Sequence, residues 1–339
     1  MLVIDGSYGE GGGQIIRTAV ALSVLTKQPI EITNIRAGRP NPGLRPQHYT
    51  ALLCIRDICD AEVQGLSVHS THLIFKSHNI KPGKYTFDIG TAGSMILVFQ
   101  ACLLSAFHTP APLTITLRGG TDVRWAPSWD YFASVFLPLI SKMGIKTEIK
   151  LIKRGYYPTG GGEATLTIHP VDTILPFVVD EPQTFTDMAG IVHRANLPDH
   201  ISTRMKHAAI KTAIRQNLRA NIQIDAASSS SSGTGITVWS TSDSTILGST
   251  VLGEKAIPAE AVGEMAANQL VQEIRSGATI DRHAFDQVLP YFVLGPKESV
   301  CLIREMSNHA KTNMWLIKHF FNVDFEVTSQ QHTLRLRVK

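Results

Sequence analysis

Apolar residues recur along the chain in one compound pattern, an amphipathic helix followed by two short strands. Between Trp129 and Met143, apolar side chains are spaced so that they fall on one face of a helix. Three other segments repeat this order, and the four copies span residues 48–76, 129–169, 201–240 and 310–338. Each copy predicts one helix and one β-hairpin. The predicted strands are 62–64 and 73–75, 146–153 and 163–169, 221–225 and 235–239, and 325–327 and 334–338.

A second similarity relates residues 10–33 to residues 90–116. Both segments begin with a glycine turn, continue as a helix that is apolar nearly all round, break at a proline and end as a strand. A helix without a polar face is expected to be buried. Long repeats of helices and strands predict an α/β fold of the α+β type, in which helix-plus-β-hairpin units build one large domain.

The third copy is set apart from the others by the segments around it. It follows a proline-containing stretch flanked by acidic residues, 178–183, and contains five consecutive serines, 228–232, which predict a flexible loop tip. We therefore predict a smaller inserted α/β domain over residues 181–275. The large domain then consists of residues 1–180 and 276–339.

The composition narrows the class of protein without identifying a function. With 339 residues, 43% of them hydrophobic, the chain can bury a sizeable core, and its net charge of +4 is mildly basic. The cysteines are scattered and predict buried thiols in a reducing compartment: Cys54, Cys59, Cys102 and Cys301. No signal peptide and no membrane-length apolar run is visible. The expectation is a soluble, cytoplasmic protein.

The glycine turn at residues 9–13 is the first segment that suggests chemistry. A glycine-rich turn before a helix presents free N–H groups, which suits phosphate, but a tight turn without a ligand is equally compatible with the sequence. Glu10 within this turn suits a magnesium or manganese ion beside phosphates.

Three further segments carry polar or flexible residues in an unusual density. Residues 36–48 hold three arginines and three prolines in a stretch without acids, which suits phosphate binding or a rigid surface loop. Residues 154–163 hold three adjacent glycines, which suit either a close backbone approach or a simple hairpin turn. His309 lies near the start of a predicted helix, where the dipole favours a neutral imidazole. It can therefore be a nucleophile or an ordinary surface residue.

Together, these segments resemble the RNA 3′-terminal phosphate cyclases from end to end. The matching segments occur in the family's order: GEGGGQIIRT, RAGRPNPGLRPQH, TAGS, GGTD with the following AP, RGYYPTGGGEA, HAFDQ and HAKTN. RGYYPTGGGEA is the most specific of them. The resemblance implies a repeated α/β fold with a smaller inserted domain.

The resemblance also implies an activity, in which ATP is used to convert an RNA 3′-phosphate to a 2′,3′-cyclic phosphate. His309 matches the nucleophile that takes up AMP, and Glu10 matches a residue associated with Mg²⁺ or Mn²⁺. The residues implied to bind ATP are Arg17, Gln100, Pro127, His283, Asp286 and Gln287. The residues implied to lie near phosphates of ATP or the RNA end are Arg36, Arg39 and Gln47. His283 replaces the tyrosine that the resemblance leads us to expect.

Two alternative functions remain open from the sequence. One is a non-catalytic, cyclase-like RNA-binding protein in ribosome assembly, a group understood to lack the histidine that corresponds to His309. The other is an enolpyruvyl transferase, which has a related repeated architecture. A lysine-adenylylating ligase is disfavoured because Asp5 and Gly6 are not preceded by the lysine of a KxDG motif.

The expected partners are ATP and RNA 3′-phosphate ends. The oligomeric state is left open, with a homodimer as one option.

Overall fold

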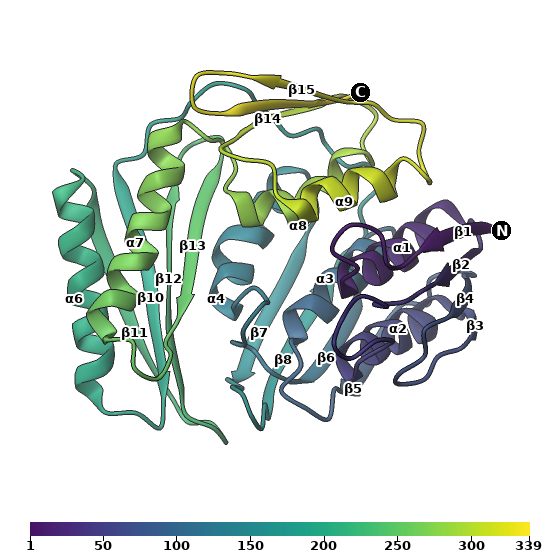
Figure 1. The fold of residues 1–339 in the computed structure, drawn as a ribbon, viewed down its shortest axis with the longest axis horizontal. Helices are drawn as coiled ribbons and strands as arrows, with labels where there is room; N and C mark the ends of the chain where they lie inside the picture. Colours follow the sequence, from purple (N-terminus) through teal and green to yellow (C-terminus); the bar gives the residue numbers. More distant parts are fainter.

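The fold is built from three copies of one β-α-β-α-β-β unit and one additional four-stranded sheet (Figure 1). The structure, a computed structural model, describes residues 1–339. The first unit consists of β1 (Leu2–Asp5), α1 (Gly13–Thr26), β2 (Ile30–Thr33), α2 (Pro46–Cys59), β3 (Glu62–Gln64) and β4 (Leu73–Lys76). The second consists of β5 (Gly83–Asp88), α3 (Met95–Ala106), β6 (Leu113–Gly119), the helical segment 129–142, β7 (Thr147–Lys153) and β8 (Gly162–Ile168). The third consists of β9 (Val178–Val179), α8 (Arg282–Phe292), β14 (Ser299–Ile303), α9 (Asn308–Ile317), β15 (Phe325–Ser329) and β16 (Leu334–Val338).

All three units share one sheet topology. The sheet orders are β1-β2-β4-β3, β5-β6-β8-β7 and β9-β14-β16-β15. In each sheet the first two strands are parallel, and the closing hairpin joins them antiparallel. This topology confirms the predicted α+β class. It also shows that the predicted helix-plus-hairpin pattern is the second half of a longer unit.

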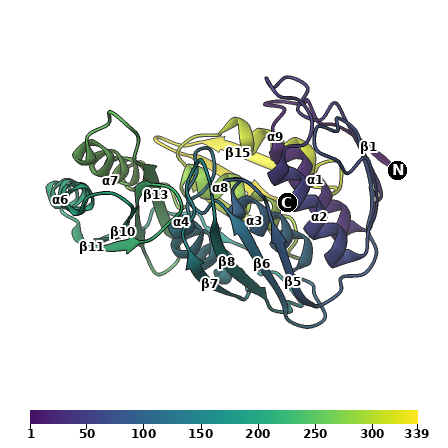
Figure 2. The same ribbon diagram turned by 90° about the horizontal axis from the view of Figure 1, so that it is seen from below.

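Helices of the three units pack against one another between the three sheets (Figures 1 and 2). α1 contacts α2, α3 and α9, and α8 contacts both α3 and α9. Ten of the twelve residues of α3 are buried, as expected for a helix that is apolar nearly all round. Through this packing, the start of α9 lies beside the start of α1. The four cysteines are free and buried, as predicted.

The predicted long helix after Trp129 is present, but its middle is wider than an α-helix. It consists of α4 (Trp129–Tyr131), a π-helical turn, η1 (Phe132–Phe136), and α5 (Leu137–Lys142). The Leu137 N–H donates to the Phe132 carbonyl, five residues earlier. Pro138 follows directly, and its missing N–H and its ring disfavour regular α-helical bonding to the preceding turn.

The fourth sheet interrupts the third unit between β9 and α8. Its elements are β10 (Asp187–Ala195), α6 (Asp199–Arg215), β11 (Arg219–Ala227), β12 (Gly233–Thr241), β13 (Ile246–Leu252) and α7 (Ala259–Ser276). Figure 1 shows this sheet, together with α6 and α7, at one side of the molecule. It has a hydrophobic core of its own, which includes Met188, Met205 and Leu270. The domain limits at 181 and 275 remain a prediction.

The hairpin that the sequence predicted between residues 221–225 and 235–239, in this fourth sheet, is wrong. The sheet order is β11-β10-β12-β13, so β10 lies between the two strands that were expected to pair. β10 was not predicted from the sequence because Gly190, His193 and Arg194 interrupt its apolar pattern. Gly190 is required there, since an added Cβ would lie 2.9 Å from the Thr237 carbonyl oxygen.

The serine run 228–232 is also held more firmly than a flexible loop tip. The Ser229 hydroxyl donates to the Arg154 carbonyl at 3.0 Å, and the Ser231 hydroxyl accepts from the Thr159 N–H at 3.2 Å. These bonds join the fourth sheet to the second unit. None of the helices combines the length and the apolar character that crossing a lipid bilayer requires.

Candidate active site

His309 and Glu10 meet where the first and third units pack together. Ser307 caps α9 by accepting a hydrogen bond from the Ala310 N–H at 2.9 Å, which places His309 in the first turn. The His309 Nε2 lies 3.5 Å from Glu10 Oε2. The Gln14 side chain donates to the His309 carbonyl at 3.3 Å and ties α1 to the same turn. The fold thus joins two residues from opposite ends of the chain.

The surroundings of His309 favour the neutral imidazole. Burial lowers its pKa below 6.5, and the charges of Arg17, Arg39 and His283 act in the same direction, whereas Glu10 opposes them. The position at a helix N-terminus also disfavours a positive charge. At neutral pH, His309 therefore has a nitrogen lone pair available for attack on an electrophile.

Glu10 lies between Arg39 and His309 with its oxygens still accessible. Arg39 Nη2 is 3.7 Å from Glu10 Oε2, and the two side chains are 40% and 36% exposed. Both contacts of this carboxylate are longer than a hydrogen bond. An accessible carboxylate with free lone pairs fits a Mg²⁺ or Mn²⁺ ion, which prefers oxygen ligands.

The glycine turn before α1 forms the second wall of this site. Gly9 and Gly11 adopt φ angles of 58° and 54°, and Gly12 caps α1 without a side-chain bond, which leaves N–H groups free. At Gly13, an added Cβ would lie 2.0 Å from His48 Nε2, so a side chain is excluded. Burial lowers the pKa of nearby Arg17 to about 10, where it still carries a positive charge at pH 7. These features suit an anion.

The predicted ATP-binding residues of α8 are connected to this site by hydrogen bonds. Gln100 donates to Gln287, whose side chain donates in turn to the His283 carbonyl at 2.7 Å. Asp286 accepts from the Ser307 hydroxyl that also caps α9. Burial raises the pKa of Asp286 to about 7. Asn313, which the sequence analysis did not single out, holds the Asp286 carbonyl at 2.8 Å.

Three other predicted residues have contacts that serve the loops around the site. Arg36 donates to the carbonyls of Asn41 and Gly43 at 2.7 and 2.8 Å and so braces its own loop. Gln47 accepts from the Ser94 N–H at 2.8 Å, at the start of α3. Pro127 is half-buried in the loop between β6 and α4.

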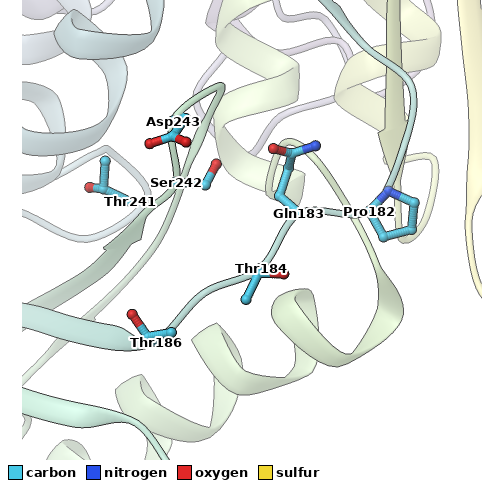
Figure 3. Close-up of a pocket in the computed structure, with 7 residues that line it drawn as sticks. All are labelled: Pro182, Gln183, Thr184, Thr186, Thr241, Ser242 and Asp243. Carbon is cyan, nitrogen blue, oxygen red and sulfur yellow. The ribbon is translucent and has the colours of Figure 1, made fainter.

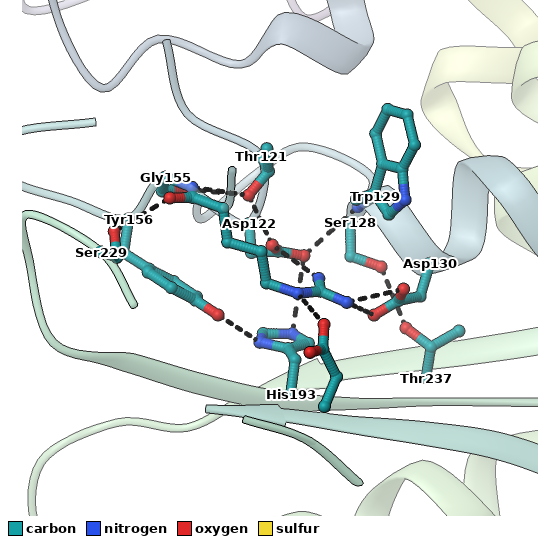
Figure 4. Close-up of polar contacts among 12 residues, drawn as sticks. Thr121, Asp122, Ser128, Trp129, Asp130, Gly155, Tyr156, His193, Ser229 and Thr237 are labelled. Atoms are coloured by element: carbon teal, nitrogen blue, oxygen red, sulfur yellow. Dashed lines mark hydrogen bonds and ion pairs between the residues drawn. The ribbon is translucent and has the colours of Figure 1, made fainter. Parts of the chain in front are cut away.

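A second polar cluster, centred on Arg154, is buried between the second unit and the fourth sheet (Figure 4). The Arg154 guanidinium contacts Asp122 at 3.1 Å, Asp130 at 2.9 Å and Asp225 at 2.7 Å. His193 from β10 lies 3.5 Å from Asp122 and 2.8 Å from the Tyr156 hydroxyl. Arg154 and Tyr156 belong to the RGYYPTGGGEA segment and Asp122 to GGTD. The other members were missed because only the fold brings their segments together: Asp130, His193 and Asp225.

The Arg154 cluster does not fit a metal ion, although ligand atoms of Asp122, Asp130 and His193 lie within 4.8 Å of one another. The guanidinium already occupies the space between both carboxylates. Burial disfavours the charge of Arg154, but Asp122 and Asp130 more than offset this and raise its pKa. The cluster is therefore a structural contact that joins the second unit to the fourth sheet.

The glycines of the same segment allow backbones to approach closely. An added Cβ at Gly155 would lie 2.3 Å from the Gly119 carbonyl oxygen, and one at Gly160 would lie 2.8 Å from that of Thr91. Gly161 has a φ of 67° and faces Ser230. The segment is also the connection of the β7–β8 hairpin, so both interpretations of this motif hold, and the group that approaches the glycines is the protein's own backbone.

A polar pocket of about 510 Å³ lies at the edge of the fourth sheet, between the segment that leads into β10 and the turn that joins β12 to β13 (Figure 3). Its lining residues are Pro182, Gln183, Thr184, Thr186, Thr241, Ser242 and Asp243. None of the residues predicted to bind ATP, metal or RNA is among them. The pocket therefore lies apart from the site around His309.

Comparisons with known proteins identify the family of the chain. The family model described as RNA 3′-terminal phosphate cyclase matches residues 8–327. The RNA 3′-terminal phosphate cyclase of Nitrosospira multiformis is 40% identical, over 100% of this chain and 97% of the relative. That of Methanopyrus kandleri is 39% identical, over 98% and 96%, and that of Methanosarcina mazei is 38% identical, over the whole of both. The chain belongs to the RNA 3′-terminal phosphate cyclase family.

Proposed function

We propose that this protein uses ATP to convert the 3′-terminal phosphate of RNA into a 2′,3′-cyclic phosphate, through an AMP adduct on His309. The observation that carries the proposal is the contact of a neutral, half-exposed His309 with Glu10 beside Arg17 and Arg39. An uncharged nucleophile next to cationic side chains and free helix N–H groups suits attack on a phosphate of ATP.

The reaction proceeds in three displacements at phosphorus. A ring nitrogen of His309 attacks the α-phosphorus of ATP, and the bond to the β-phosphate breaks to release pyrophosphate. An oxygen of the RNA 3′-phosphate then attacks the AMP phosphorus and breaks its bond to His309. Finally, the neighbouring 2′-hydroxyl attacks the RNA phosphorus, loses its proton and expels AMP. Tethering of the 2′-hydroxyl next to its target gives this last step a high effective concentration.

The residues around His309 have separate roles in this scheme. Arg17, Arg39 and the N-terminus of α1 would hold the triphosphate, and Gln100, Asp286 and Gln287 would hold the nucleoside. Glu10 would hold Mg²⁺ or Mn²⁺, which neutralises phosphate charge when bound. Asp286 also fixes α9 through Ser307 and so orients the first turn that carries His309.

The proposal is tested with α-³²P-labelled ATP and either divalent metal. We expect a labelled, acid-labile adduct on the wild-type protein and its loss in His309→Ala. His200→Ala is the matched control, because His200 is exposed at the start of α6 and outside the site. A 3′-phosphorylated RNA added to the labelled protein should discharge the label and yield a cyclic end.

The contrary result is equally specific. If folded wild-type protein forms no adduct with either metal, or if His309→Ala still forms one, the adduct mechanism is wrong. RNA binding that persists without adduct formation would favour the non-catalytic alternative.

A further inference from the structure

The glycine turn runs antiparallel along one face of α9. Three consecutive turn residues, Tyr8, Gly9 and Glu10, contact Trp315, Thr312 and His309 in that order. The helix residues are spaced by three, so they lie one above another on the same face. Each step along the turn therefore corresponds to about one turn of the helix, and the position of Glu10 depends on the two contacts before it.

The outer contact is an aromatic stack. The Tyr8 and Trp315 rings lie 3.8 Å apart between centroids, with an angle of 10° between their planes. Trp315 is held in place by its other contacts. It packs against the main hydrophobic core, and its ring meets the His319 ring edge to face, with 4.6 Å between the centroids. Such aromatic pairs contribute about 0.5–1.5 kcal/mol beyond the area that they bury.

The middle contact leaves no room for a side chain. A Cβ added to Gly9 would lie 2.6 Å from Thr312 Oγ1. Thr312 is buried, and its hydroxyl donates to the Asn308 carbonyl at 2.8 Å, so it has no freedom to retreat. Gly9 therefore allows the turn to lie directly on the helix.

We propose that Tyr8 and Trp315 are positioning residues, whose stack fixes the glycine turn on α9 and so holds the Glu10 carboxylate at His309. The inference rests on the proposed function for its catalytic consequence. Its geometric content, the placement of Glu10, stands independently of any activity. Neither aromatic residue was a candidate site residue in the sequence.

The proposal is tested first in nucleotide-free protein by NMR. The Hε1 signal of His309, assigned by its loss in His309→Ala, should shift in Glu10→Gln because the carboxylate charge next to the ring is removed. We expect Tyr8→Ala and Trp315→Leu to shift this signal in the same direction. Tyr8→Phe should leave it in place, because it retains the stacking ring.

The second readout is the single-turnover rate of adduct formation. Tyr8→Ala should lower the maximal rate about tenfold to a hundredfold, as expected for a misplaced catalytic group, with the ATP concentration for half-maximal rate nearly unchanged. Tyr8→Phe should restore the rate. The double variant Tyr8→Ala/Trp315→Leu should be no slower than either single variant, because both remove one interaction.

The outcomes separate this inference from the proposed function. A wild-type rate in Tyr8→Ala, together with an unmoved His309 signal, would overturn the positioning role while the adduct mechanism stands. If the signals shift as described but wild-type protein forms no adduct, the placement of Glu10 is supported and the proposed mechanism fails. Tyr8 is 43% exposed and lies outside the core, so Tyr8→Ala provides a folded test even if Trp315→Leu does not.

Discussion

Single residues in the site depend on partners that are remote in sequence. The helix N-terminus that holds His309 was visible in the sequence, and so was the acidic residue in the glycine turn. Their 3.5 Å contact was not, because it results from packing between the first and third units. His48, which excludes a side chain at Gly13, and Ser307, which links Asp286 to α9, were overlooked for the same reason.

We predict that Glu10→Gln separates metal use from stability. Adduct formation should become slower and require more Mg²⁺ or Mn²⁺, because the amide is a weaker ligand for a hard cation. Glu10 is partly exposed and its ion pairs are long, so their loss should cost less than about 1 kcal/mol. A metal titration of the adduct rate and a thermal melt measure both effects. An unchanged metal dependence would contradict the role of Glu10.

Elements with a clear apolar period were predictable, and elements with a broken period were not. Three hairpins follow their helices as expected, because their alternating strands and turns carry a local signal. The π-turn before Pro138 and the central strand β10 depend on bonding partners that no local pattern shows. A two-residue strand such as β9 is defined by its pairing alone.

Helix α7 contains a buried acid that should make stability depend on pH. Arg304 donates to Glu273 Oε1 at 3.0 Å, while the buried Oε2 has no partner. Burial raises the pKa of Glu273 to about 7 from 4.5. The folded protein therefore binds a proton more tightly than the unfolded chain, and the free energy of unfolding should fall as pH rises through that interval.

Glu273→Gln should remove this contribution. Relative to wild type, the variant should gain up to about 3 kcal/mol in the free energy of unfolding between pH 5 and pH 8. Urea unfolding curves at the two pH values measure it. Glu298→Gln is the control, because it makes the same substitution at an exposed carboxylate. An equal effect of both variants would contradict the prediction.

At the scale of the whole molecule, the Arg154 cluster fastens the fourth sheet to the second unit. Arg154→Met should lower the free energy of unfolding by about 3–5 kcal/mol, since it leaves buried carboxylates without their partner. Urea unfolding and limited proteolysis of the 181–275 segment would detect the loss. Arg118→Met, which removes the exposed pair with Glu163, should cost less than about 1 kcal/mol. Equal losses would show that burial is irrelevant here.

The parallel pairing of Val178 with Val300 spans the whole fourth sheet and has a consequence during synthesis. All strands of the first two units have been synthesised once residue 168 has left the ribosome. By contrast, β9 has no parallel partner until more than a hundred further residues have been added and β14 has been synthesised. Contacts of such wide separation form late. The two-residue length of β9 keeps this waiting edge short, and a short unpaired edge offers little template for aggregation on the growing chain.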